Sequence, residues 1–502
     1  MSKPVTQGSL FRSRIAKEFD KKTAEFHTSV NEDLRIFEDD LNCTTAHDIM
    51  LHEQGIIPVK EIKLILSALD GIRQKWRACE VSIGAEYEDV HEYIETTVIK
   101  QIGIEAGGMI HTGRSRNDQV VTDIKLRLRE DILAMGEATL NLVDTLQKRA
   151  TEHADTPMIL YTHGQHAQVG TMGAYLSAHA DILLRDQQRL AELYARVNTN
   201  PLGAGPVGGT SININRKRTT ELLGFDAIHE NAIDATSARD WAVETCAVCA
   251  ITNTDLSRLA ADILEWSTVE FGYVELSDEY SSSSSIMPQK KNPSTIELLR
   301  GKTGQSTGAL MEILTMTKGL ASGYVQDLQE TKLTLWRTVY NTQICLAIME
   351  GAIDTMKIKP EKLAKPLQGN FAMAVELAET LANDTNLSFR EAYKIAADLT
   401  NLTIGRSSTL DKLTPKDVEE SAVKLYKKSI KITQALIDKA TDPMKSLERR
   451  VSLGSPSPKE VKKMLKEHAV TAKKQRIDLD KKKAAVEEAL ANLHSIAAKL
   501  SK

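Results

Sequence analysis

The stretch from Ser281 to Pro293, SSSSSIMPQKKNP, combines residue types that could bind and deprotonate an anionic substrate. It carries five hydroxyl groups, the ammonium groups of Lys290 and Lys291, and the amide of Asn292. Pro288 and Pro293 lack a backbone N–H and restrict the residues before them to extended conformations, and no helix or strand pattern fits the stretch. Serine runs are usually mobile polar loops. The sequence leaves that interpretation open beside a loop that closes on a carboxylate.

A second polar segment, HTGRSRNDQ from His111 to Gln119, lies directly before a long helical pattern. Ser115 or Asp118 can accept hydrogen bonds from the first amides of that helix. Arg114 and Arg116 flank Ser115, and guanidinium groups beside a helix N-terminus suit a carboxylate. Two interpretations stay open: a carboxylate site, or a capping turn whose arginines pair with surface acids.

Two further segments place polar groups ahead of long helices. YTHGQHAQ, from Tyr161 to Gln168, contains two histidines and two glutamines, and the members of each pair are three residues apart. A helical turn would place His163 and His166 on one face, although a single histidine is more often a satisfied core residue than a catalyst. SGYVQDLQETK, from Ser322 to Lys332, precedes a helix expected from about Leu333.

Long helical patterns adjoin all four segments and must position them. Ser294 and Glu297 have the S-x-x-E spacing of a capping box. The helix behind Asn292 would therefore direct its positive N-terminal end at whatever the serine-rich loop binds. Apolar residues recur at three- and four-residue intervals over residues 120–153, 171–197, 235–276, 294–320 and from 333 onward.

Two smaller clusters of chemically capable residues have ordinary explanations. His91 lies near Asp89 and Glu92 and could belong to a metal site. Ligands on one helix turn with no partner cluster favour solvated surface instead. Cys246 and Cys249 form a CxxC at helical spacing, with no second pair for a metal, which favours buried helical thiols.

Composition excludes several classes of protein. The 502 residues are 41% hydrophobic and 26% charged, and their net charge is −4. Because the chain has no excess of basic residues to neutralise phosphates, a nucleic-acid partner is not expected. No apolar run approaches the length of a membrane span, and the N-terminus lacks the apolar core of a secretory signal. Five scattered cysteines suit a reducing compartment, so we expect a cytoplasmic protein.

The abundance of Ala, Leu, Lys and Glu favours helices. Shorter helices occupy residues 1–111, beginning with LFRSRIAKEFDKKTAEF, long helices occupy residues 112–362, and a smaller helical domain occupies residues 363–502. The glycine-rich residues 200–216 lack the Lys-Ser/Thr ending of a phosphate-binding loop, which favours a tight connection. In the terminal helix lysines alternate with acids, which indicates a solvated face.

Together the four segments resemble the motifs of the fumarase/aspartase superfamily of elimination enzymes, and most closely those of the argininosuccinate lyases. SSIMPQKKNP resembles the superfamily signature loop, and HTGRSRNDQ matches the argininosuccinate lyase form of the first motif residue for residue. YTHGQHAQ resembles THLQRAQ, and GYVQDLQETK resembles YNRDLQEDK. The resemblance implies an all-α protein of three domains, with the long central helices forming a twenty-helix bundle in a homotetramer. Each active site would draw its motifs from three subunits.

The activity that the resemblance implies is anti-elimination of argininosuccinate to arginine and fumarate through an aci-carboxylate intermediate, in arginine biosynthesis or a urea cycle. No metal or organic cofactor is implied. Ser284 would be the catalytic base, supported by Lys290, and His163 with Glu297 as its charge partner would assist proton transfer at the leaving nitrogen. The residues that would bind the substrate are Arg114, Ser115, Asn117, Thr162, Ser285, Asn292, Tyr324, Gln329 and Lys332.

Departures from the family pattern keep alternatives open. Ser282 and Ser283 stand where the family has Thr-Gly, and losing that glycine removes backbone freedom from the loop. Gly164 and His166 replace the Leu and Arg of THLQRAQ. One alternative is a related fumarate-releasing lyase with another amine leaving group, although HTGRSRNDQ argues against a purine substrate. The other is a catalytically silent relative like the lens crystallins, against which the retention of Ser284 argues.

Overall fold

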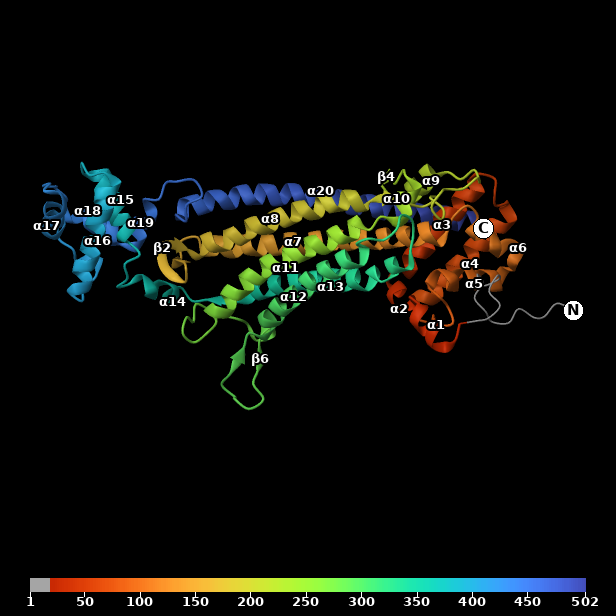
Figure 1. The fold of residues 1–502 in the computed structure, drawn as a ribbon, viewed down its shortest axis with the longest axis horizontal. Helices are drawn as coiled ribbons and strands as arrows, with labels where there is room; N and C mark the ends of the chain where they lie inside the picture. Colours follow the sequence, from red (N-terminus) through yellow and green to blue (C-terminus); the bar gives the residue numbers. More distant parts are fainter. Residues whose placement is uncertain (1–18) are drawn as a thin grey trace.

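Six long helices run lengthwise through the molecule and form its centre (Figure 1). The computed structural model describes residues 19–502, and within that range these are the helices of 24 or more residues. The sequence predicts all six of them, the last as the lysine-rich terminal helix, with bounds that differ by several residues. They are α7 Arg116–Glu152, α8 Met172–Val197, α11 Asp240–Trp266, α12 Ser294–Thr317, α13 Thr331–Thr355 and α20 Pro458–Leu500.

The last helix, α20, lies along this bundle although it is rich in lysine. Its buried residues Leu465, Ala472, Leu479, Val486 and Leu493 recur at every seventh position, a repeat that holds one helix face against its neighbours. The first four join the core that α20 shares with α7 and α8, and Leu493 joins the core of the N-terminal lobe. The predicted C-terminal domain is therefore divided, because α20 returns to the bundle.

The N-terminal lobe packs at one end of the bundle around its own apolar core (Figure 1). The predicted first helix begins at residue 10, but residues 10–18 lie outside the described range, and the described helix begins at Lys21. The lobe contains α1 Lys21–His27, α2 Val30–Asp33, α3 Phe37–Glu53, α4 Val59–Arg77, α5 Val90–Ile102 and α6 Ile104–Gly107. Two short helices, α9 Arg216–Leu223 and α10 Ala232–Ser237, lie in the connection between α8 and α11.

A small helical lobe occupies the opposite end of the bundle (Figure 1). It has a separate core, which also takes in Ile159 and Val169 from the bundle end. The helix α14 Pro360–Ala364 leads into it. Its helices are α15 Ala374–Asp384, α16 Phe389–Gly405, α17 Pro415–Tyr426, α18 Gln434–Thr441 and α19 Pro443–Glu448.

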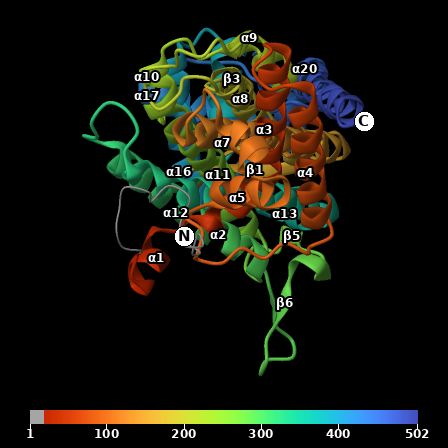
Figure 2. The ribbon, with the colours of Figure 1, turned by 90° about the vertical axis from the view of Figure 1, so that its right-hand side faces the viewer.

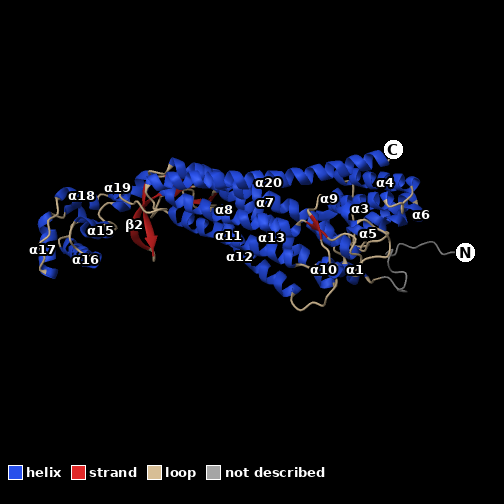
Figure 3. Cartoon of the chain, turned by 90° about the horizontal axis from the view of Figure 1, so that it is seen from above, coloured by secondary structure: helices blue, strands red, loops and turns tan. Residues whose placement is uncertain are grey.

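Short strands are the exception in a molecule that is otherwise helical (Figure 3), which confirms the all-α prediction. Strands β1 Pro157–Thr162 and β2 Gln165–Thr171 form one hairpin, and β6 Ser282–Ser283 with β7 Lys291–Asn292 forms another. Two more pairs join distant parts of the chain: β3 Thr199–Asn200 with β4 Ala227–Ile228, and β5 Val274–Glu275 with β8 Lys357–Ile358. Within residues 19–502 no helix combines the length and the apolar character needed to cross a membrane.

Two other sequence predictions are confirmed by the local structure. Cys246 and Cys249 lie buried inside α11, and burial raises the pKa of each thiol to about 12. The glycine-rich connection is tight, because the amides of Gly203 and Gly205 both donate to Asp118 Oδ2, at 2.9 and 2.7 Å. These two amides therefore bind a carboxylate of the same chain, and these hydrogen bonds hold the connection in place.

Candidate active site

The serine-rich segment forms a hairpin that projects away from the bundle (Figures 1 and 2). Ser282 pairs with Asn292 and Ser283 with Lys291. The prediction that no strand pattern fits this stretch is therefore wrong at its two ends. At the tip, Ile286 is 83% exposed, so an apolar side chain is held in solvent where a substrate or another chain could cover it.

Ser284 lies just beyond the short strand and its hydroxyl receives backbone hydrogen bonds. The amide of Met287 donates to Ser284 Oγ at 3.0 Å, and the amide of Ile286 donates to the same atom at 3.4 Å. Donors aimed at an oxygen favour its ionised form. This turn therefore lowers the free energy needed to form an alkoxide at Ser284. Ser285 and Lys290 lie exposed on the same hairpin.

Lys291 and the start of α12 fix the base of the hairpin. The ammonium of Lys291 lies 2.7 Å from Asp278 Oδ1. Helix α12 begins at Ser294, and its N-cap residue is Pro293, which has no side-chain cap hydrogen bond. The predicted capping box is therefore wrong, because Ser294 already belongs to the helix. This leaves the exposed carboxylate of Glu297 outside any capping role.

Replacing Ser283 with glycine should loosen the hairpin without unfolding the protein. Ser283 is not among the described non-glycine residues with positive φ, so its backbone does not need glycine. Glycine in a strand costs roughly 0.5–1 kcal/mol, which predicts amide exchange about two- to fivefold faster over residues 282–292. Hydrogen-exchange mass spectrometry measures this, with Ser277→Gly outside the strand pair as the control. Unchanged exchange in the hairpin would contradict the role given to Ser283.

The segment from Tyr161 to Gln168 is a β-hairpin, and not a helical turn of the kind that would place His163 and His166 on one face. Tyr161 pairs with His166 and Thr162 with Gln165, which leaves His163 and Gly164 as the two turn residues. Their φ angles are +54° and +70°, and positive φ at both central residues is what a type I′ turn requires. Gly164 after an aromatic and β-branched run was the signal that sequence reasoning missed. The turn exposes His163 and Thr162 to solvent.

The segment from His111 to Gln119 caps α7 as predicted. Ser115 and Asp118 form a reciprocal capping box. Arg116 Nη1 lies 2.9 Å from Asp89 Oδ2, so Arg116 joins the motif to the start of α5. Arg114 is only 8% exposed, and both of its terminal nitrogens donate to Thr44 Oγ1 at 3.1 Å. This arrangement directs Arg114 toward α3 and opposes its predicted contact with substrate.

Two predicted substrate-binding residues, Asn117 and Lys332, lie at the N-terminal end of the bundle. Asn117 Nδ2 donates to the carbonyl of Pro206 at 3.0 Å. The buried ammonium of Lys332 pairs with Asp33 Oδ1, and Ser29 Oγ donates to the other oxygen of Asp33 at 2.5 Å. Sequence reasoning missed Ser29 and Asp33, because nothing in their short helix marks them as polar partners of Lys332.

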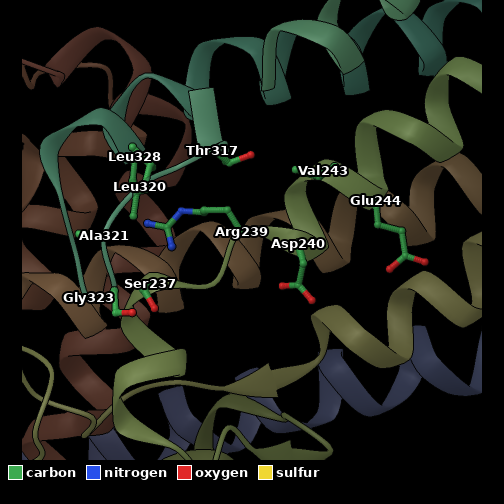
Figure 4. Close-up of a pocket in the computed structure, with 11 residues that line it drawn as sticks. Ser237, Arg239, Asp240, Val243, Glu244, Thr317, Leu320, Ala321, Gly323 and Leu328 are labelled. Carbon is green, nitrogen blue, oxygen red and sulfur yellow. The ribbon is translucent and has the colours of Figure 1, made fainter. Parts of the chain in front are cut away.

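The segment from Ser322 to Lys332 also borders a cavity of about 540 Å³ (Figure 4). Gly323 and Leu328 lie on one side, and Arg239 points into the space from the start of α11. Burial lowers the pKa of Arg239 to about 10, and the nearby phenol of Tyr324 acts in the opposite direction. Gln329 lies on the neighbouring surface, where its side-chain Nε2 donates to the carbonyl of His27 at 3.1 Å.

The structure brings the predicted site residues together in three separate groups. Ser115, Asn117, Tyr324, Gln329 and Lys332 lie near the N-terminal lobe. The β6–β7 hairpin, with Ser284, Ser285, Lys290, Asn292 and the adjoining Glu297, projects from the bundle, and the β1–β2 hairpin with Thr162 and His163 lies toward the small lobe (Figure 1). One chain therefore presents three parts of a site at three places.

Known proteins match this chain over nearly its whole length. The family model described as "Lyase" matches residues 13–308, and the model described as "Argininosuccinate lyase C-terminal" matches residues 371–448. The argininosuccinate lyase of Nitrosopumilus maritimus is 41% identical over 96% of this chain and 98% of its own length. The chain belongs to the argininosuccinate lyase family.

Other members and relatives agree with this assignment. The argininosuccinate lyase of Methanosarcina mazei is 38% identical over 97% of this chain and 98% of its own length. A structure of an EDDS lyase variant with bound fumarate superimposes with a TM-score of 0.84, at 29% identity over 96% of this chain and 94% of that chain. A class II fumarase from Schistosoma mansoni shares the fold alone, with a TM-score of 0.69 and 15% identity over 85% of this chain and 94% of that one. The protein is thus a carbon–nitrogen lyase of this argininosuccinate lyase family.

Proposed function

We propose that this protein cleaves argininosuccinate to arginine and fumarate. The observation that carries the proposal is the 41% identity to a curated argininosuccinate lyase across 484 residues, which includes all four motifs. A cytoplasmic role in arginine synthesis is part of the proposal, and the free state of all five cysteines fits a reducing compartment.

In the proposed reaction Ser284, as its alkoxide, removes the proton from the carbon next to a carboxylate. The electron pair left on that carbon enters the carboxylate and forms an aci-carboxylate dianion. Stabilising this dianion is the main demand on the site, and Lys290, Asn292 and the N-terminus of α12 supply the positive charge and donors. The amides that donate to Ser284 Oγ support the base itself.

The second step breaks the carbon–nitrogen bond. The electrons of the aci-carboxylate re-form a carbonyl and a new carbon–carbon double bond, and the bonding pair leaves with the guanidino nitrogen. His163, with Glu297 as its charge partner, assists delivery of a proton to that nitrogen. The products are fumarate and arginine. The residues proposed to hold the substrate are Ser115, Asn117, Thr162, Ser285, Tyr324, Gln329 and Lys332. Arg114 is proposed to support Ser115, the residue next to it in the chain, through its hydrogen bonds to Thr44.

We further infer a homotetramer with shared sites. The separation of the three groups of site residues supports this, and so does the exposed face of the long helices. Leu298 and Met311 on α12 and Tyr340 on α13 are 67%, 60% and 57% exposed, more apolar surface than a bundle helix normally leaves in water. Other copies of the chain would bury it.

The glycines of α12 support the same inference. A Cβ atom added at Gly301, Gly304 or Gly308 would meet no other atom within 4 Å. Glycine inside a helix costs roughly 0.5–1 kcal/mol relative to alanine, and nothing within residues 19–502 of the single chain requires glycine at these positions. The close approach of a helix from another copy of the chain would account for glycine at these positions.

The purified protein should release fumarate from argininosuccinate and not from adenylosuccinate. Fumarate absorbs in the ultraviolet, so one spectrophotometer follows both reactions. A related amine-releasing lyase would prefer another substrate, and a crystallin-like protein would release no fumarate at all. Absence of turnover with argininosuccinate by the folded protein would overturn the proposed function.

A further inference from the structure

Three titratable side chains from different helices meet where the N-terminal lobe joins the bundle. They are Asp40 on α3, His91 on α5 and Asp123 on α7, and their exposed fractions are 0%, 3% and 0%. The prediction that His91 lies on solvated surface is therefore wrong. It faces inward because its own helix packs against α3 and α4, and the partner cluster that the sequence did not reveal comes from outside α5.

The donor atoms of these residues converge on one point. One nitrogen or oxygen from each lies within 4.8 Å of the others. His91 Nδ1 is 3.3 Å from Asp40 Oδ2 and 3.4 Å from Asp123 Oδ2. Bonds of about 2.1 Å to a tetrahedral zinc ion place neighbouring ligand atoms roughly 3.4 Å apart, which is the spacing found.

The converging atoms lack hydrogen-bond partners within the described protein. Asp40 Oδ2, both nitrogens of His91 and both oxygens of Asp123 are buried without a contact of hydrogen-bond geometry. Buried polar atoms are almost always satisfied. Three of these atoms, Asp40 Oδ2, His91 Nδ1 and Asp123 Oδ2, face one another, and a bound cation would satisfy them.

Neither Arg114 nor Gln119 donates to the converging oxygen atoms. The terminal nitrogens of Arg114 donate to Thr44 and not to the carboxylates. Gln119 Nε2 donates to Asp40 Oδ1, which leaves Asp40 Oδ2 directed at His91.

We propose that Asp40, His91 and Asp123 bind one divalent transition-metal ion of the zinc class. Two carboxylate oxygens and one imidazole nitrogen form a ligand set that suits zinc. The proposal does not depend on which substrate the enzyme cleaves.

The ion would be structural and would tie α3, α5 and α7 together. The ligand Asp40 is hydrogen-bonded by Gln119, the last residue of the HTGRSRNDQ segment. Its helix neighbour Thr44 receives Arg114 from the same segment. Binding of the ion would thus hold this substrate-binding segment on the N-terminal lobe, away from the reacting carbon and the base.

Metal content and thermal stability of tag-free, full-length protein test the proposal. After EDTA treatment and desalting, wild type should take up one Zn²⁺ per chain, measured by inductively coupled plasma mass spectrometry. Zinc at about a hundred times its Kd should raise Tm by about 2–3 °C for a chain of this size. Asp123→Asn and His91→Asn should lose both effects. Asp48→Asn is the matched control, because Asp48 is equally buried but outside the cluster, and it should keep both.

Two results with zinc would overturn the proposal. If EDTA-treated wild type takes up no zinc and Tm does not respond, His91 is an imidazolium held between two carboxylates. If Asp123→Asn and His91→Asn still bind one equivalent, the ion binds elsewhere. Should these variants fail to fold, Co²⁺ added to wild type decides: intense visible bands of four-coordinate cobalt at one equivalent support the site, and weak six-coordinate bands contradict it.

Discussion

Replacing Ser284 with alanine should lower kcat by about 100- to 10,000-fold, the usual loss when a positioned general base is removed. The methyl group cannot accept the proton from carbon. It also leaves the amide of Met287, which donates to Ser284 Oγ at 3.0 Å, without its acceptor. The side chain is only partly buried on a projecting hairpin, so stability should change little. Fumarate release at saturating argininosuccinate measures kcat, and size exclusion with circular dichroism checks the fold.

Variants at two neighbouring serines test whether the loss of activity is specific to Ser284. Ser282→Ala is the matched control, because Ser282 lies exposed in β6 and contributes to the hairpin through its backbone. It should retain near-normal kcat. Ser285→Ala should mainly raise KM, since Ser285 is proposed to contact substrate. If Ser284→Ala kept near-normal kcat, the base would have to be another group.

The sequence predicts the long helices well because their apolar spacing is a local property that many residues share. It misjudges the two hairpins that carry Ser284 and His163. The two strands of the serine-rich segment are two residues each, too short to show an alternation of apolar and polar residues. Their pairing joins Ser283 to Lys291, which are eight positions apart in the chain. The His163 turn did carry a signal in Gly164, but a three-residue spacing of histidines also fits a helix.

Burial and capping depend on contacts that no local pattern shows. His91 looks like a surface residue in its own helix, and only the packing of α3 and α7 brings Asp40 and Asp123 to it. The S-x-x-E spacing at Glu297 is a real capping signature, yet α12 starts one residue earlier because Pro293 takes the N-cap position. Sequence spacing therefore identifies candidate groups, whereas tertiary packing decides which of them are free to react.

Mixing two inactive variants, Ser284→Ala and His163→Asn, should restore activity. Ser284 lies on the projecting β6–β7 hairpin and His163 on the β1–β2 turn toward the small lobe (Figure 1). A site that takes these residues from different subunits is intact whenever one subunit supplies the serine and the other the histidine. Random exchange at equal amounts would leave about one quarter of the sites of a symmetric tetramer intact. Fumarate release after subunit exchange measures the recovery.

The double variant Ser284→Ala/His163→Asn is the control that makes the recovery interpretable. Mixed with either single variant it can form no intact site, so any activity in that mixture reports wild-type contamination or a different mechanism. Recovery in the first mixture alone requires that Ser284 and His163 act across a subunit boundary. If exchange is confirmed by mass spectrometry of intact oligomers and no activity returns, both residues work within one chain. The separation of the two hairpins would then have to close by a large movement of the chain itself.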